Sequence, residues 1–174
     1  MLPIIDQRQI AVAAFLNLFR GWEAFLEGAM TKYMAGRKSA LGRRPRKYVS
    51  PKDIDRALKI LIGTGRYFDF ANHENVKRVA FLYFHDGRPF EPHISSITTD
   101  LSDLRAMRNA SAHISSTTQA SLEAVAARVL GSPSSGIELY DFLMAQNPNS
   151  FAGETVFSTY KDKLLVVAEL IANG

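Results

Sequence analysis

The sequence predicts an all-α protein: an up-and-down bundle of about five to seven helices in a single domain, residues 1–174. Apolar residues recur at steps of three and four along most of the chain, which is the period of an amphipathic helix. No alternation of apolar and polar residues is long enough to favour a sheet, and residues 67–70 come closest to a strand. With 47% apolar and 22% charged residues, the composition is that of a globular domain with a substantial core.

The longest periodic stretch predicts a helix over residues 6–35, with Gly36 as its C-cap. Its apolar face, which we expect in the core, consists of Phe15, Leu18, Phe19, Trp22, Phe25, Leu26, Met30 and Tyr33. Glu23 and Glu27 fall on the opposite face of this helix. The sequence leaves open whether they face solvent or contribute to a functional site.

A basic segment, residues 37–47, follows this helix within a predicted loop over residues 37–50. It contains no acid, and its basic residues are Arg37, Lys38, Arg43, Arg44, Arg46 and Lys47. Such a cluster suits a polyanion such as RNA, because each neutralised phosphate releases counterions. The alternative is a solvated loop that binds nothing.

Start and stop signals predict the remaining helices. Ser50 as N-cap, Pro51 in the first turn and Asp53 mark the start of a helix that Gly63 ends. The Asp-Gly-Arg-Pro sequence at residues 86–89 predicts a loop that extends to residue 99. The serine and glutamine at positions 116 and 119 match a capping box. The other predicted helices cover residues 72–85, 100–113, 116–131, 137–146 and 155–172.

The run Arg108-Asn109-Ala110-Ser111-Ala112-His113, here called the motif, closes one of these helices. An arginine can hold a phosphate through several donors in a fixed fork. A histidine can exchange a proton near neutral pH. These groups suit attack of a ribose 2′-hydroxyl on the adjacent phosphate, with His113 moving protons and Arg108 stabilising the charge on phosphorus. Asn109 would orient the histidine or the phosphate.

The spacing of the motif favours a bend at the helix end. Residues five apart on a helix are rotated by roughly 140°, so Arg108 and His113 do not share one stripe, whereas Asn109 and His113 do. We therefore expect the helix to fray or bend over residues 113–115. The small residues of the motif also allow close approach of another helix, including that of a second copy.

The motif resembles that of the HEPN superfamily, the higher eukaryotes and prokaryotes nucleotide-binding domain, with the RiboL-PSP-HEPN branch as the nearest. That signature is an arginine followed by a polar residue, with four to six residues in all between the arginine and a histidine. Here four residues, Asn109 to Ala112, lie between Arg108 and His113. Many relatives have glycine after the histidine, where this chain has Ile114. The resemblance implies a homodimer whose two motifs form one composite cleft, and metal-independent RNA cleavage that leaves a cyclic phosphate. It also implies a toxin or antiphage defence effector with a possible antitoxin or partner protein, in which Arg108 and His113 are catalytic and Asn109 is the accompanying polar residue.

Other residues offer weaker sites. His85-Asp86 and Glu91-x-His93 lack the helical spacing of paired metal ligands, and we expect surface or packing roles for them. The chain has no cysteine, which excludes disulfides, zinc–thiolate sites and cysteine nucleophiles. No metal or cofactor is expected. The absence of a signal peptide and of a membrane span predicts a soluble, cytoplasmic protein.

Three functions remain open from the sequence. The first is a dimeric HEPN-type ribonuclease. The second is a non-catalytic RNA- or nucleotide-binding module that uses the basic segment and Arg108 to hold phosphate. The third is a helical adaptor that oligomerises through its small-residue surface.

Overall fold

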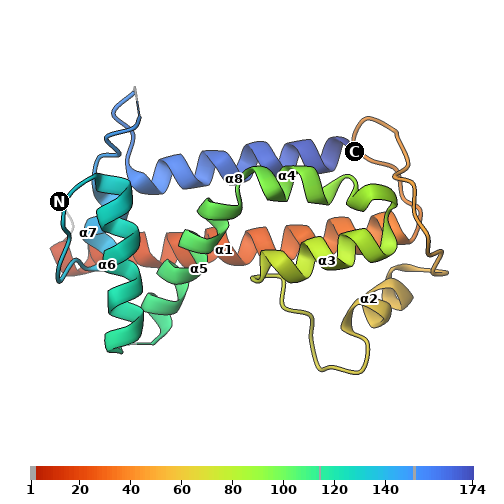
Figure 1. Cartoon of the computed structure of the whole chain (residues 1–174), viewed down its shortest axis with the longest axis horizontal. Helices are drawn as coiled ribbons and strands as arrows, with labels where there is room; N and C mark the ends of the chain where they lie inside the picture. Colours follow the sequence, from red (N-terminus) through yellow and green to blue (C-terminus); the bar gives the residue numbers. More distant parts are fainter. Residues whose placement is uncertain (1–2, 114, 151) are drawn as a thin grey trace. The chain divides into compact units, whose positions relative to one another are not determined.

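The computed structural model describes residues 3–113, 115–150 and 152–174, and over these residues the chain is all-α, as predicted (Figure 1). The described part contains eight α-helices and one 3-10 helix, η1, and its β pairing consists of two isolated bridges, Lys47 with Phe84 and Gln146 with Thr155. The helices are α1 (Ile4–Met34), α2 (Ile54–Ile62), α3 (His73–Tyr83), η1 (His85–Gly87), α4 (Phe90–Ser96), α5 (Thr98–Ala112), α6 (Ser116–Leu130), α7 (Leu139–Met144) and α8 (Val156–Asn173).

The internal contacts of the chain divide it into two compact units. Unit 1 comprises Met1–Arg20 and Thr99–Lys163, and unit 2 comprises Gly21–Thr98 and Leu164–Gly174. Both α1 and α8 therefore contribute residues to both units. Each unit is described by itself.

Unit 1 is built around the apolar faces of α5, α6 and α7. Its fully or almost fully buried apolar residues include Phe15, Leu104, Met107, Leu122, Ala126, Phe142, Leu143 and Val156. A buried carboxylate ties three helices together: Asp103 of α5 accepts a hydrogen bond from the Tyr160 hydroxyl of α8 at 2.7 Å and pairs with Arg128 of α6 at 2.5 Å. Burial, and then the neighbouring Asp103, raise the pKa of Tyr160, so this phenol stays a neutral donor.

Unit 2 is centred on the aromatic residue Phe90 at the start of α4. Its ring lies 5.3 Å from that of Phe84 and 5.9 Å from that of Tyr33, measured between ring centroids. The Tyr33 hydroxyl in turn donates to the carbonyl of Ile171 at the end of α8. The other fully or almost fully buried apolar residues of this unit include Leu26, Met30, Met34, Ala57, Val76, Ala80, Ile94 and Ile171.

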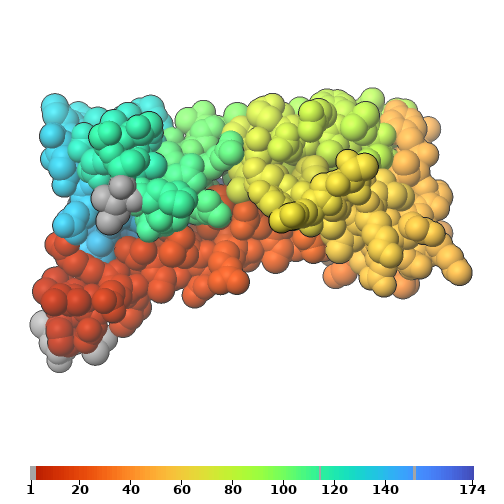
Figure 2. All heavy atoms as spheres, turned by 90° about the horizontal axis from the view of Figure 1, so that it is seen from below, coloured from red at the N-terminus to blue at the C-terminus, as the bar shows by residue number. Residues whose placement is uncertain are grey.

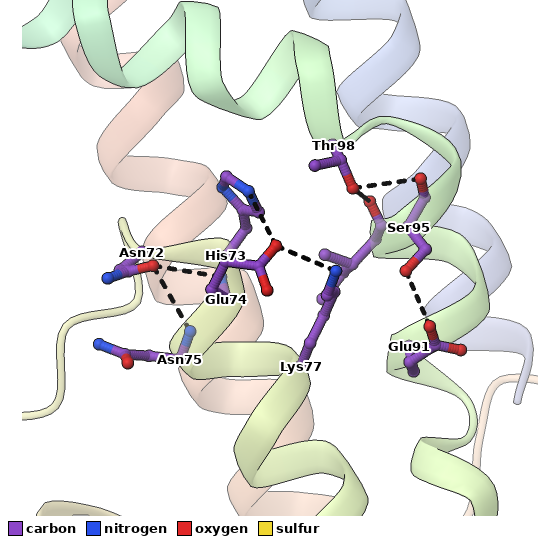
Figure 3. Close-up of polar contacts among 9 residues, drawn as sticks. Asn72, His73, Glu74, Asn75, Lys77, Glu91, Ser95 and Thr98 are labelled. Atoms are coloured by element: carbon purple, nitrogen blue, oxygen red, sulfur yellow. Dashed lines mark hydrogen bonds and ion pairs between the residues drawn. The ribbon is translucent and has the colours of Figure 1, made fainter.

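Helix α3 packs against α4, and both begin with local polar contacts (Figure 3). The Asn72 side chain caps α3 by accepting from the backbone N–H groups of Glu74 and Asn75, which have no partner within the first helical turn. Glu74 then pairs with Lys77 one turn later at 3.0 Å. Across from it, the Ser95 hydroxyl of α4 donates to Glu91 at 2.8 Å. These contacts are the ordinary polar surface of two amphipathic helices.

Most predicted helices are confirmed, with ends displaced by one or two residues. Of the eight apolar residues assigned to the core of α1, six are buried, and Leu18 and Phe25 are half-buried. Gly36 (φ 81°) and Gly131 (φ 70°) hold the left-handed conformations expected after α1 and α6. Residues 67–70 form no strand.

The prediction of a continuous loop over residues 86–99 is wrong, because α4 lies within it. The breaking residues precede this helix, and Pro92 stands in its first turn, where no backbone N–H is needed. Complete burial of Phe90 and Ile94 supplies the apolar face that the short segment needs to be stable.

Two predicted N-caps are also wrong. Asp53, not Ser50, caps α2, since its carboxylate accepts from the Arg56 N–H at 2.7 Å. The capping box of α6 is formed by Ser115 with Thr118, one residue earlier than the predicted pair.

Candidate functional site

The motif lies at the C-terminal end of α5, in unit 1, where Figure 2 shows the end of α5 and the start of α6, in green and teal, on the surface. The side chains of Arg108 and His113 are both exposed, and that of Asn109 is half-buried. On the preceding turns, Leu104 and Met107 are buried and fix the helix to the core. The functional candidates therefore project from a well-anchored helix into solvent.

The backbone of His113 is held from both sides. Its N–H donates to the carbonyl of Asn109 at 3.0 Å, which completes the last turn of α5. Its carbonyl accepts from the hydroxyl of Thr118, the third residue of α6 and a member of its capping box, at 2.5 Å. The helix ends at Ala112, so the predicted interruption at residue 113 is confirmed; the part of that prediction that concerns Ile114 lies outside the described residues.

Arg108 and Asn109 contact each other. Nη1 of Arg108 donates to the side-chain oxygen of Asn109 at 3.4 Å, and the Ser111 hydroxyl donates to the carbonyl of Arg108 at 2.6 Å. One guanidinium nitrogen is thus directed by a neighbour while the exposed fork retains donors for an anion.

An apolar groove of about 460 Å³ adjoins the motif at Ser111, one turn beyond Arg108. Its walls come from the first turns of α1 and from α7, and they include Val12, Leu16 and Leu139. Arg8 lies over the ring of Tyr140 at its rim, 5.3 Å from the centroid, and pairs with Glu138 and Asp141. A planar apolar group bound beside the motif would find a preformed wall here.

The basic segment belongs to unit 2, whereas the motif belongs to unit 1. Arg37, Lys38, Arg43, Arg44 and Arg46 are exposed and Lys47 is half-buried. The backbone of the segment is attached to unit 2 at two places, because Ala40 N–H donates to the carbonyl of Ala172 and residues 46–48 pair with residues 83–85. Its cations therefore stand on a fixed backbone.

Within the part of the chain that the structure describes, two of the six basic side chains form hydrogen bonds to other residues. Lys47 donates to the carbonyl of Met34 at 2.5 Å, which caps the C-terminal end of α1 and favours its helix dipole. Arg43 donates to the carbonyl of Gly174 at 3.4 Å. Lys47 is thus a structural cap as well as a member of the basic segment.

The sequence interpretation left Arg88 out and assigned His85 and His93 to surface or packing roles. Together with Arg46 and Asp86, these residues line a cleft of about 490 Å³ in unit 2. The backbone pairing of residues 46–48 with residues 83–85 brings Arg46 close to His85 and Asp86. This pairing is irregular, so no periodic pattern in the sequence predicts it. The only local signal in the sequence that favours an anion site here is the set of six positive charges in the basic segment, which includes Arg46.

Within the described residues, no group of three or more histidine, aspartate and glutamate side chains is arranged to hold a metal ion. None of the described helices is long and apolar enough to cross a bilayer.

Comparison with family models, curated proteins and solved structures found no match to this chain. The resemblance of the motif to the HEPN signature therefore rests on the residues of the motif.

Proposed function

We propose that this protein is a metal-independent endoribonuclease of HEPN type, which acts as a homodimer and serves as a toxin or defence effector. The observation that carries the proposal is the joint exposure of Arg108 and His113 at the end of one helix, with the backbone of His113 hydrogen-bonded on both sides. A catalytic group whose backbone is fixed loses little entropy when it meets its substrate.

The reaction divides its work among three side chains. The His113 ring accepts the proton of the ribose 2′-hydroxyl, whose oxygen then attacks the adjacent phosphorus. The bond to the 5′-oxygen breaks, and a ring of the second motif copy in the dimer can protonate that leaving group. The Arg108 fork bonds the phosphate oxygens as charge develops on them, and Asn109 directs the fork. The products are a 2′,3′-cyclic phosphate and a 5′-hydroxyl.

The apolar groove beside Ser111 supports a nucleotide substrate. A base next to the scissile phosphate can lie against its apolar wall, while the charged groups meet the backbone. Arg37, Lys38, Arg44 and the other cations of the basic segment would add sequence-independent attraction for the strand.

Cleavage of labelled single-stranded and structured RNA in the presence of EDTA tests the proposal. Substituting His113→Ala should reduce the rate by about 10²–10⁴-fold, the usual contribution of a general acid–base. Substituting Arg108→Ala should cost about 10²–10³-fold, as for loss of one donor to a developing charge. Asn109→Ala should cost less than either.

Matched controls are available in the same unit. Arg20→Ala removes an exposed arginine of α1, and Ser116→Ala alters an exposed residue beside the motif; both should cleave at the wild-type rate. Cleavage by both the His113→Ala and Arg108→Ala variants at the wild-type rate would overturn the proposal. Salt-sensitive RNA binding without cleavage by the wild type would favour the non-catalytic binding module instead.

A further inference from the structure

The cleft of unit 2 that holds His85 and His93 is separate from the motif residues and has its own chemistry. Its polar walls are Arg46, His85, Asp86, Arg88 and His93, and three prolines and Gly174 complete it. Two arginines, two histidines and one aspartate thus line the same cleft. Among the described residues, neither Arg46 nor Arg88 forms an ion pair with an acid, so both forks keep their donors for a ligand.

The walls of this cleft are held by backbone contacts. The N–H of His85 donates to the carbonyl of Arg46 at 3.0 Å, and the N–H of Arg88 donates to the carbonyl of His85 at 3.1 Å. Below them, Phe84 and Phe90 are fully buried and in ring contact. The cationic groups therefore stand on a preorganised backbone, which lowers the entropy cost of binding.

Two of the side chains are oriented by neighbours. Nδ1 of His85 lies 3.0 Å from the Asp86 carboxylate, which leaves Nε2 as the ring nitrogen that can meet a ligand. Burial lowers the pKa of His93, and the nearby positive charge of Arg88 lowers it further. The His93 ring is therefore neutral near pH 7, and the Arg88 guanidinium beside it supplies positive charge for an anion in the cleft.

An exposed aromatic ring stands beside the cleft. Tyr48 is 64% exposed, and its ring centroid lies 5.9 Å from that of His85. Its backbone N–H donates to the carbonyl of Tyr83 at 2.9 Å, so the residue is anchored although its ring is in solvent. Such a ring can stack on a nucleobase, and this distinguishes a nucleotide from a bare phosphate as the preferred ligand.

We propose that this cleft binds the phosphate group of a nucleotide, with Arg46 and Arg88 bonding the phosphate oxygens, His85 and His93 lining the phosphate and Tyr48 stacking on the attached base. A free mononucleotide and a nucleotide within an RNA strand present the same chemistry. The site lies wholly in unit 2 and does not depend on the nuclease proposed for the motif.

Calorimetric titration of the full chain tests the site and separates the two sources of nucleotide. The probes are adenosine monophosphate, inorganic phosphate, adenosine and a short single-stranded RNA. Adenosine monophosphate should bind more tightly than inorganic phosphate, and adenosine should bind weakest. If the RNA binds and the mononucleotide does not, the occupant is a strand; if the mononucleotide binds as well as the RNA, it is a free nucleotide.

Variants identify the residues. The double substitution Arg46→Gln/Arg88→Gln should weaken binding of the tighter probe by about ten- to hundredfold, the effect of losing charge-assisted hydrogen bonds. Tyr48→Ala should weaken the binding of adenosine monophosphate and leave the binding of inorganic phosphate unchanged. Arg66→Gln, which removes an exposed arginine elsewhere in unit 2, is the matched control.

A second measurement does not depend on the folding of any variant. Diethyl pyrocarbonate modifies exposed imidazoles, and mass spectrometry locates the product on each histidine. Saturating adenosine monophosphate, or the RNA if that binds more tightly, should protect His85 and His93 several-fold. Failure of every probe to bind, binding unaffected by the double substitution, or unprotected His85 and His93 at saturation would each overturn the proposal. Retained binding in His113→Ala would show that this site and the motif are independent.

Discussion

At the scale of single residues, the accessibility of the motif depends on how its neighbours are buried. Met107 and Leu104 pack in the core of unit 1, whereas Arg108 beside them is exposed. Asp103, one turn earlier, is 5% exposed and holds α5 to Tyr160 and Arg128. The direction in which Arg108 points is thus set by apolar packing and by one buried carboxylate.

Loss of the Tyr160 hydroxyl should weaken unit 1. In Tyr160→Phe, the buried carboxylate of Asp103 loses a donor, which should lower the free energy of unfolding by about 1.5–3 kcal/mol, as for a hydrogen bond to a charged group. Urea denaturation measures the change. Tyr140→Phe keeps the ring on which Arg8 lies and should change stability by less than about 0.5 kcal/mol. Equal stability of the two variants would show that the hydrogen bond from Tyr160 to Asp103 contributes nothing.

The histidine of α4 should make unit 2 sensitive to acid. Because burial and then Arg88 lower the pKa of His93 below its ordinary 6.5, the unfolded chain binds more protons than the folded chain just below that pH. The free energy of unfolding should therefore fall as the pH is lowered from about 7 to about 5.5. His93→Gln should show a smaller fall in denaturant titrations at these two pH values. An unchanged pH dependence in this variant would contradict the shift.

At the scale of secondary-structure elements, the junction between α5 and α6 fixes His113. The hydroxyl of Thr118 both receives the N–H of Ser115 within the capping box and donates to the carbonyl of His113. The Thr118 side chain therefore helps to cap the start of α6 and also holds His113, the residue that follows the end of α5.

Substitution of this threonine should separate stability from activity. Thr118→Val and Ser115→Ala each remove half of the capping box and should each lower the free energy of unfolding by about 1 kcal/mol. Only Thr118→Val also releases the carbonyl of His113, so it should lower kcat for RNA while KM changes little. If both variants cleave RNA equally well, Thr118 has no positioning role.

The elements differ in how far the sequence predicts them. The long apolar face of α1 and the glycines at positions 36 and 131 are strong local signals, and the structure agrees with them. Helix α4 has seven residues and depends on burial of Phe90 and Ile94 by distant segments, which no local pattern shows. The cleft around Arg88 depends on backbone pairing between residues 46–48 and 83–85, which is equally invisible in one sequence. The chemistry of their side chains identifies Arg108 and His113 as candidates from the sequence alone. The structure adds that both side chains are exposed to solvent.

At the scale of the whole molecule, the candidate sites are distributed over two compact units. The motif and its apolar groove belong to unit 1, and the basic segment and the cleft of Arg46 and Arg88 belong to unit 2. We therefore expect substitutions in the candidate site of one unit to leave the candidate site of the other unit undisturbed.

A composite active site makes activity depend on assembly. If two motif copies form one cleft, the cleavage rate per mole of protein should fall when the chain is diluted below its dimer dissociation constant. Sedimentation velocity over the same concentrations should show the dimer dissociating in parallel. A monomeric protein with a constant specific activity would rule out a shared site and leave the motif to act within one chain.

The most direct test of the central claim uses an RNA strand and the same strand with a 2′-deoxy sugar at the cleaved position, both labelled at the 5′-end and incubated with wild type and His113→Ala in EDTA. We predict that the wild type cleaves only the RNA and leaves a 2′,3′-cyclic phosphate, and that His113→Ala leaves both strands intact. Cleavage of the deoxy-substituted position, a free 3′-hydroxyl on the product, or unchanged cleavage by His113→Ala would contradict the account.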